Sequence, residues 1–172
     1  MKQVFPGPYE DQYESAVVPI GTELEGDPRK GDKYVFFKNA CYADNGTTEQ
    51  SILQGETIYQ CTRAANAMYE GTNNISLADI KLVAGIAMGT IEFGKWGVAQ
   101  IKGPSDFVRT DAGVAVGDAL VGDTNDGEAD TLAAGAEHLV FGFAQKDDVT
   151  ITDDNGDDLD GCEAVLTNCL WG

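Results

Sequence analysis

The sequence predicts an all-β protein: a compact β-barrel or sandwich of two similar halves, with an extended N-terminal arm and at most one short helix. Three observations support this prediction. Apolar residues fall in short runs bounded by Gly, Asp and Asn, which is typical of antiparallel strands. The 172 residues include 21 glycines, a composition that favours a barrel or sandwich over a helical bundle. A pattern of corner, strand and V-x-G-apolar-A occurs twice along the chain.

Residues 112–145 show this pattern most clearly. The pair Gly117-Asp118 predicts a corner, and Ala119–Val121 predicts the strand that follows it. Asp123–Asp130 is rich in Asp, Asn and Gly and predicts a turn, after which Leu139–Phe143 forms a second apolar run. The stretch therefore indicates two strands on either side of an acidic turn.

The first half of the chain contains the same elements in the same order. The corresponding segments are Gly55–Tyr59 and Gly117–Val121, then Val83–Ala87 and Val140–Ala144, then the apolar strands Trp96–Ile101 and Glu163–Leu170. Self-similarity of this kind is typical of a repeated structural unit. We therefore predict one β-structure built from two similar halves.

Three further segments complete the predicted elements. Lys33–Ala40 is a strong strand in which a run of Tyr, Val and two Phe predicts that both faces are covered. Ser76–Val83 begins as a helix N-cap does, with Asp79 three residues after Ser76, so we predict either one short helix or a loop there. The run Gly103–Asp106 predicts the end of the strand that starts at Trp96.

Residues 1–20 predict an extended arm, and residues 21–172 a single β-rich domain with an acidic excursion at 147–161. Prolines in the arm exclude a regular helix. Aromatic side chains on an extended segment need a surface to cover them, so this segment is either an arm that becomes ordered against a partner or a frayed terminus. The candidate contact residues are Val4, Phe5, Tyr9 and Tyr13.

The charge of the chain excludes several classes of partner. The formal net charge is −18, and residues 111–160 contain 14 acidic side chains but only one basic one, Lys146. Such a surface repels nucleic-acid backbones and anionic membranes, so we predict neither as a partner. No apolar run approaches the roughly 20 residues of a membrane span, and the N-terminus lacks an apolar signal core. We expect a soluble protein made in the cytosol, with the acids forming a solvated face.

The sequence offers no catalytic constellation. His138 is the only histidine, and no Ser or Cys lies in a recognisable nucleophile motif. No G-x-x-x-x-G-K-[ST] loop is present to hold a phosphate. We therefore predict no enzyme, no catalytic residue and no cofactor; a small hydrolase built around His138 is the alternative that this prediction opposes.

Two acidic turns are the best candidates for a hard cation. Residues 123–130 and 153–161 supply closely spaced oxygen ligands around a glycine, as Ca²⁺ requires. Neither fits the twelve-residue calcium loop, because Ala134 and Ala164 occupy the position of its final glutamate. We predict acidic β-turns and no dedicated metal site.

The four cysteines predict no zinc site. Cys41, Cys61, Cys162 and Cys169 include no C-x-x-C pair. We predict reduced thiols in the core, with a disulfide as the alternative if the protein matures outside the cell.

Three segments carry a resemblance to a known family: V-A-V-G-D-A-L at Val114–Leu120, V-F-G-F-A at Val140–Ala144, and the closing strand Ala164–Leu170. With them, residues 96–170 resemble the capsid decoration (cement) proteins of phage heads. The resemblance implies a compact β-barrel without catalysis that binds the major capsid protein on the outer surface of the shell. It also implies a homo-oligomer, most often a trimer, made in the host cytoplasm and located in the virion. The long portion before residue 55 and the acidic excursion depart from the simplest members.

Two hypotheses about function follow. The first is a non-enzymatic decoration protein that binds the outside of a phage capsid and stabilises it, with the arm and the strand edges as contacts. The alternative is a virion adhesion or fibre-base module whose acidic turns bind Ca²⁺.

Overall fold

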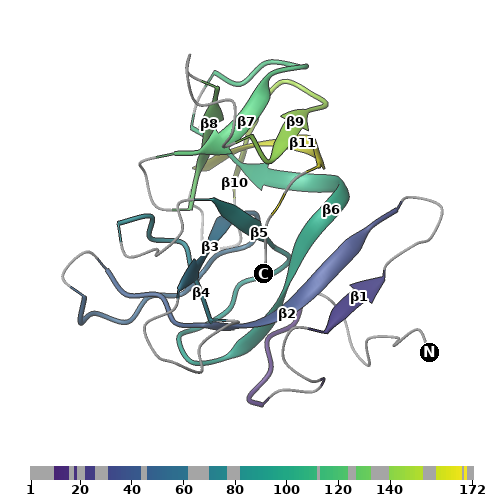
Figure 1. Cartoon of the computed structure of the whole chain (residues 1–172). Helices are drawn as coiled ribbons and strands as arrows, with labels where there is room; N and C mark the ends of the chain where they lie inside the picture. The colour runs from purple at the N-terminus through teal and green to yellow at the C-terminus, as the bar shows by residue number, and fades with distance from the viewer. Residues whose placement is uncertain are drawn as a thin grey trace.

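A computed structural model describes residues 10–15, 18, 22–25, 31–43, 46–61, 70–76, 82–111, 113–123, 127–132, 140–152, 158–167 and 169. These residues form eleven β-strands and no helix, so the all-β prediction is confirmed, and none of them forms a helix able to cross a membrane (Figure 1). The strands are β1 Glu23–Glu25, β2 Lys33–Asn39, β3 Thr57–Cys61, β4 Glu70–Thr72, β5 Val83–Ala87, β6 Trp96–Arg109, β7 Ala119–Gly122, β8 Ala129–Thr131, β9 Gly142–Ala144, β10 Val149–Thr152 and β11 Asp158–Leu166. Most of the segment for which we predicted a short helix or a loop lies outside the described residues.

Five strands close into the first barrel. Their order is β2-β4-β3-β5-β6, and β2 pairs in turn with the N-terminal part of β6. All pairs are antiparallel except β2 with β4. The interior is filled by buried apolar side chains: Val35, Phe37, Cys41, Ile52, Ile58, Ala87, Ile91 and Ala99. Tyr34 to Phe37 are all buried, which confirms that β2 is covered on both faces.

Four further strands and the C-terminal part of β6 form a second barrel in the same order, while β1 pairs with β2 outside it. The C-terminal part of β6 pairs with β11, followed by β9, β7 and β8. A single parallel bridge between Thr110 and Ala129 joins β8 back to the end of β6. The hairpin partner β10 lies outside this ring, on β11. In Figure 1 the second barrel sits above the first, with β6 running through both.

β6 is longer than the sequence indicated. We predicted that the strand from Trp96 would end at Gly103–Asp106, but it continues to Arg109, so this prediction is wrong. Gly103 has a φ of +97°, which lets the backbone bend sharply while the ladder continues. At the bend the partners of β6 change from β2 and β5 to β11. The glycine-proline pair therefore marks the passage between the barrels, not a strand end.

The acidic excursion predicted at 147–161 is in part a β-hairpin. Val149–Thr152 and the start of β11 pair with each other, with Thr150 opposite Asp160. We expected the last strand to begin at Glu163, whereas β11 begins at Asp158. Alternating Val-Thr-Ile-Thr is a β pattern that the density of acids obscured.

The predicted likeness of the two halves is confirmed down to the pairing of single residues. Gly85 of β5 lies opposite Ile58 of β3, and Gly142 of β9 lies opposite Leu120 of β7. The next strands match as well, since Ala87 pairs with Ala99 and Ala144 with Ala164. The barrels are thus two copies of one structural unit that share the strand β6.

The corner before β3 and the corner before β7 use the same chemistry. Gly55 has a φ of +82° and Gly117 a φ of +91°, at the third position of a β-turn, where a left-handed residue is needed. The carboxylate that follows accepts a hydrogen bond from the residue three positions earlier. These bonds are Leu53 N to Glu56 Oε2 at 2.8 Å and Ala115 N to Asp118 Oδ2 at 2.9 Å.

Residues near the N-terminus cover the outer face of the first barrel. The backbones of Tyr13 and Trp96 exchange hydrogen bonds of 2.7 and 2.8 Å. Phe36 stacks on the Trp96 ring at 5.5 Å and meets the Tyr13 ring at 6.1 Å. Val18 and Leu24 are buried in the same cluster. Of the predicted arm, the described residues therefore pack against the chain's own barrel.

The two corners allow a matched test. We expect Gly117→Ala to lower the free energy of unfolding by about 1–2 kcal/mol, because alanine disfavours the left-handed conformation. Gly55→Ala should cost more, because its Cβ would come within 2.5 Å of the Phe107 ring. A side chain at Gly161 would also overlap this ring, so the ring has little room to move. Denaturant unfolding measures both variants; an equal or smaller loss for Gly55→Ala would contradict the packing argument.

Candidate functional site

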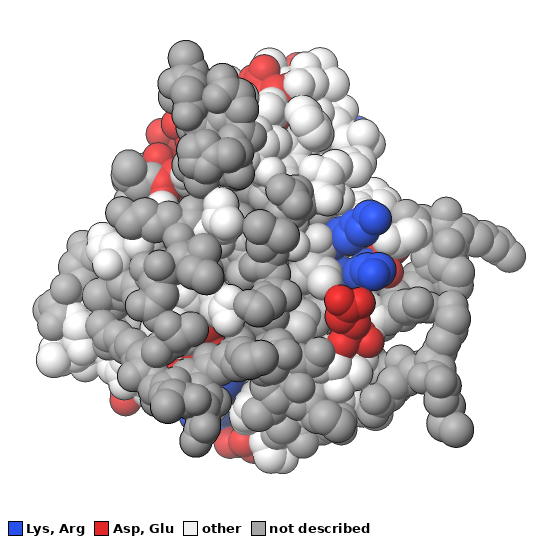
Figure 2. All heavy atoms as spheres, in the orientation of Figure 1, with Lys and Arg blue, Asp and Glu red and all other residues white. Residues whose placement is uncertain are grey.

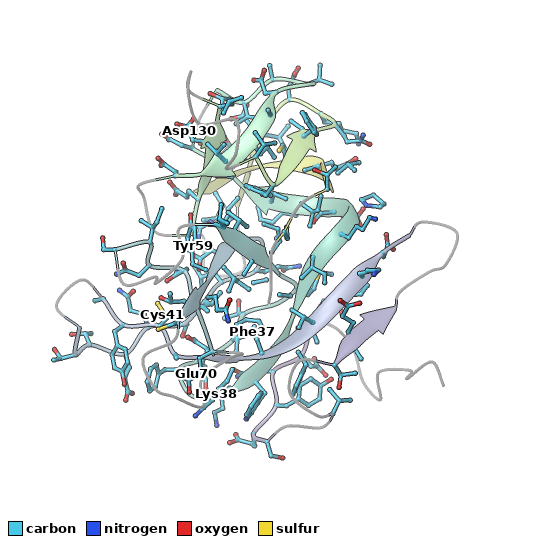
Figure 3. The ribbon with its side chains drawn as sticks, in the orientation of Figure 1. Phe37, Lys38, Cys41, Tyr59, Glu70 and Asp130 are labelled. Carbon is cyan, nitrogen blue, oxygen red and sulfur yellow. The ribbon has the colours of Figure 1, made fainter. Side chains whose placement is uncertain are left out.

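The contact between the barrels buries both polar and apolar groups, among them Tyr59, Ile86 and Glu56. Tyr59 and Ile86 point out of the first barrel and are fully buried in the core of the second. The Tyr59 hydroxyl lies so close to Gly122 of β7 that no side chain would fit there. Figure 3 shows Tyr59 between the two barrels. The side of the first barrel thus closes one end of the second.

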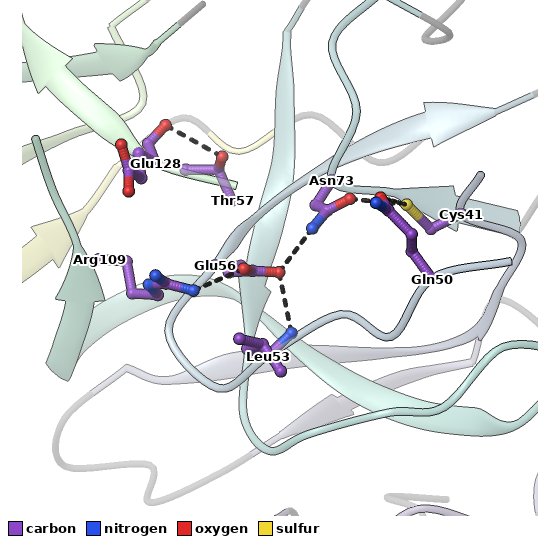
Figure 4. Close-up of polar contacts among 8 residues, drawn as sticks. All are labelled: Cys41, Gln50, Leu53, Glu56, Thr57, Asn73, Arg109 and Glu128. Carbon is purple, nitrogen blue, oxygen red and sulfur yellow. Dashed lines mark hydrogen bonds and ion pairs between the residues drawn. The ribbon is translucent and has the colours of Figure 1, made fainter. Parts of the chain in front are cut away.

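A polar junction lies at the edge of this contact (Figure 4). Arg109, at the end of β6, donates a hydrogen bond of 2.6 Å to Glu56 Oε1, and the two side chains form an ion pair. Glu56 Oε2 accepts hydrogen bonds from the Asn73 amide at 2.7 Å and from Leu53 N at 2.8 Å. The Glu56 and Arg109 side chains are only 5 % and 14 % exposed. We call Glu56, Asn73 and Arg109 the polar junction.

The β7–β8 hairpin completes the contact with its backbone. Gly127 N donates to Asn73 O at 3.0 Å, and Gly127 O accepts from Thr57 N at 2.8 Å. The Thr57 hydroxyl donates to Glu128 O at 3.2 Å. Gly127 has a φ of +80°, and a Cβ there would lie 2.7 Å from the Glu56 carboxyl carbon. A glycine is therefore required where the hairpin meets the junction.

The side chains of the polar junction hold the two barrels together. Burial raises the pKa of Glu56, while hydrogen bonds from Leu53 and Asn73 and the charge of Arg109 oppose the rise. The Cys41 thiol donates to Asn73 Oδ1 at 2.6 Å, and burial raises its pKa, which favours the protonated form. A buried, protonated thiol is a poor nucleophile. The polar groups of the junction bind one another and join the barrels.

The predicted cysteines form no disulfide in the described part of the chain. Among the described residues Cys41, Cys61 and Cys162 are buried and Cys169 is half-buried, with no disulfide between them. Burial raises the pKa of Cys162 to about 11 and that of Cys169 to about 12. These are the reduced core cysteines that the sequence predicted.

The residues predicted as partner contacts are only partly described. Tyr13 is half-buried against Phe36 of its own chain. Val4, Phe5 and Tyr9 lie outside the described residues, and so does His138. The contact role of the arm stays a prediction.

The acidic turns considered for Ca²⁺ are also incomplete, because residues 124–126 and 153–157 lie outside the described part. Within the described ranges, no three His, Cys, Asp or Glu side chains gather as metal ligands. Figure 2 shows acidic side chains on the β8 side of the second barrel and basic ones beside β1 and β2. Calcium binding at these turns stays a prediction of the alternative hypothesis.

A hollow of about 670 Å³ marks the end of the first barrel that faces away from the second. Lys38 and Glu70 lie opposite each other in the pairing of β2 with β4, and Figure 3 shows them side by side at this end. The rings of Tyr42 and Phe93, at 4.8 Å, form part of its wall. We call this region, with Lys38, Asn39, Ala40 and Glu70, the far end of the first barrel.

An apolar row crosses the outer face of the second barrel. Phe143 is 45 % exposed, and its neighbours on the adjacent strands are Ala119 on one side and Val165 on the other. Pairing continues the row to Leu132, whose N–H donates to Ala119 O, and to Pro104, opposite Val165. The five side chains of this apolar row are exposed or half-buried: Leu132, Ala119, Phe143, Val165 and Pro104.

Sequence reasoning missed both the polar junction and the apolar row. Glu56 and Arg109 are 53 positions apart, and nothing in their local sequence marks them as partners. The repeat aligns Phe143 with Ile86, but only the structure shows that both side chains point out of their barrels. Only the burial of Ile86 and the exposure of Phe143 distinguish the two faces.

The comparisons with known proteins are limited to the fold. No model of a protein family matches the sequence, and no protein with a curated description matches it. The structure is similar to the crystal structure of the N base of the head fiber gp8.5 of bacteriophage phi29, with a TM-score of 0.47 and 12 % identity over 78 % of this chain and 92 % of that one. A likeness of this degree carries no inference about what the chain does.

The buried charge in the junction makes a testable prediction. We expect Arg109→Met to lower the free energy of unfolding by about 3–5 kcal/mol at neutral pH, because it leaves Glu56 buried without its counterion. Adding Glu56→Gln should recover most of the loss. Lys146→Met, which breaks the exposed Lys146–Glu163 pair, is the control and should cost less than about 1 kcal/mol.

The same variant should change the pH dependence of stability. The folded-state pKa of Glu56 is raised, so its contribution is fully present below the unfolded pKa and is lost as the pH rises through the folded pKa. Removing Arg109 removes a charge that lowers the pKa of Glu56, so this pKa rises further. More stability is then lost as the pH increases. Arg109→Met should therefore cost more near pH 8 than near pH 5; a cost independent of pH would show that Glu56 is not the group responsible.

Proposed function

We propose that the chain is a non-enzymatic decoration (cement) protein that binds the major capsid protein on the outer surface of a phage head and stabilises the shell. The proposal joins the resemblance of residues 96–170 to that family with one observation, the apolar row on the second barrel. Adjacent apolar side chains at the surface are candidates for burial against a partner.

The row has the composition of a protein-binding face. Five apolar side chains lie next to one another across the sheet, whereas scattered single apolar residues need no explanation. Charged groups lie beside it: Glu163 is two residues before Val165, and its carboxylate pairs with Lys146 at 2.5 Å. An apolar centre with a polar rim is the usual anatomy of a protein–protein interface.

The arrangement of the two barrels suits a role in resisting mechanical force. The two barrels share β6 and are locked by the buried polar junction, so force on one barrel is passed through covalent backbone and desolvated hydrogen bonds to the other. A subunit that adds modest contacts at many symmetric sites can stabilise a shell far more than one contact would. The acidic surface, with a net charge of −18, favours a location away from nucleic acid.

Attachment to the capsid is assigned in this proposal to the N-terminal arm. Val4, Phe5 and Tyr9 are its contacts, and Tyr13 anchors the arm by its backbone pairing with Trp96. An extended segment anchored at one end can add to a neighbouring sheet edge or lie in a groove.

Sedimentation with purified capsid shells that lack the protein tests the proposal. We expect saturable co-sedimentation at a fixed ratio to the capsid subunit. Deletion of residues 1–9 should weaken binding strongly, yet spare Tyr13 and the cluster beneath it. Protein that stays in the supernatant at every concentration would contradict the function, and a deletion variant that binds at full strength would contradict the role of the arm. Thermal unfolding of the variant is the control for its fold.

A further inference from the structure

We propose that copies of this chain bind one another head to tail: the far end of the first barrel of one copy docks on the apolar row of the second barrel of the next. The contact would repeat the one that joins the two barrels within a single chain. Both of its surfaces are present a second time on the molecule, where Phe143 is 45 % exposed and Lys38 and Glu70 are half-buried.

Within the chain, the end of the second barrel docks on the side of the first. The docking end is formed by Arg109 and by the hairpin residues Gly127 and Glu128. The side that receives it includes Glu56, whose carboxylate binds Arg109, and Thr57, which bonds to the hairpin. Ile86 supplies the apolar part of the contact, since it is fully buried in the core of the second barrel.

The far end of the first barrel is equivalent to that docking end. Asn39 N bonds to Lys95 O at 2.9 Å as Thr110 N bonds to Asp160 O at 3.0 Å. Ala40 N bonds to Gly71 O as Asp111 N bonds to Ala129 O, both at 2.9 Å. Lys38 precedes Asn39 and Arg109 precedes Thr110, so Lys38 occupies the position that Arg109 has in the second barrel. Glu70 precedes Gly71 and Glu128 precedes Ala129, so Glu70 occupies the position of Glu128.

The side of the second barrel is likewise equivalent to the receiving side of the first. Gly117 N bonds to Ala144 O at 2.8 Å as Gly55 N bonds to Ala87 O at 2.9 Å. Asp118 therefore stands in the place of Glu56, Ala119 in that of Thr57, and Phe143 in that of Ile86. Ile86 has no exposed surface, but Phe143 is 45 % exposed.

The chemistry of the two free surfaces is complementary. Lys38 can pair with Asp118 of the next copy as Arg109 pairs with Glu56, because Asp118 uses one oxygen for Ala115 N, just as Glu56 uses one for Leu53 N. Within the described residues neither Lys38 nor Asp118 has an ion pair. The hollow at the far end offers space for the exposed Phe143 side chain.

This arrangement specifies the type of assembly. The two surfaces differ, so the contact is heterologous and produces either a closed ring or an open filament, not a two-fold dimer. The inference deepens the proposed function, because it names the partner of the apolar row and rests on that row being a protein-binding face. It does not require a capsid, so the two can fail separately.

The test is sedimentation velocity of the full chain without capsids, as a function of concentration. Wild type should self-associate. Lys38→Asp and Asp118→Lys should each weaken association at least about tenfold, because each places like charges opposite one another. An equimolar mixture of the two variants should associate again, since every contact in an alternating chain then joins opposite charges. Lys102→Asp, an exposed site on β6 with the same charge change, is the control and should behave as wild type.

Three outcomes would overturn the inference: a wild-type chain that stays monomeric, single variants that associate as wild type does, or a mixture that does not recover. If Asp118→Lys fails to fold, Phe143→Ser tests the same face, and full association of that variant counts against the proposal. If the chain is monomeric alone but co-sediments with capsids, and Phe143→Ser abolishes that binding, the row binds the capsid and the proposed function stands without self-association.

Discussion

The buried carboxylate of Glu56 is the constraint on which the arrangement of the two barrels depends. A charge that is removed from water must be compensated in place, and here the compensation comes from three parts of the chain: the corner at Leu53, the end of β4 through Asn73, and the end of β6 through Arg109. Because Arg109 belongs to the strand that continues into the second barrel, satisfying Glu56 fixes how that barrel sits on the first.

The likeness of the two halves places the same acidic corner at the junction and on the second barrel. Each half has a Gly-acid corner whose carboxylate accepts a backbone N–H, and in each half that carboxylate has a second oxygen available for a cation. In the first half this oxygen meets Arg109. In the second half Asp118 holds the same position, and it forms no ion pair with any described residue. One local motif therefore produces a buried joint in one place and an open surface in the other.

The pattern of covered and uncovered faces is what connects the fold to function. The outer face of the first barrel is buried beneath the second barrel and the residues around Tyr13, and polar or aromatic side chains such as Gln100 and Tyr34 are tolerated there because they are enclosed. The matching face of the second barrel has apolar residues at the same positions, Val165 and Pro104, and remains open. The proposed contacts with a partner rest on this face.

The sequence by itself determined the all-β class, the repeated unit and the corners, because strand alternation, Gly-acid turns and the V-x-G-apolar-A runs are local patterns with local causes. It also indicated the reduced core cysteines. Only the tertiary structure decided that β6 continues through Gly103 into a second barrel, that Glu56 meets Arg109, and that Ile86 is buried where Phe143 is exposed. The physical reason is that these outcomes depend on which surfaces meet in space, and residues at equivalent positions in the two halves have the same local geometry whether or not another surface covers them.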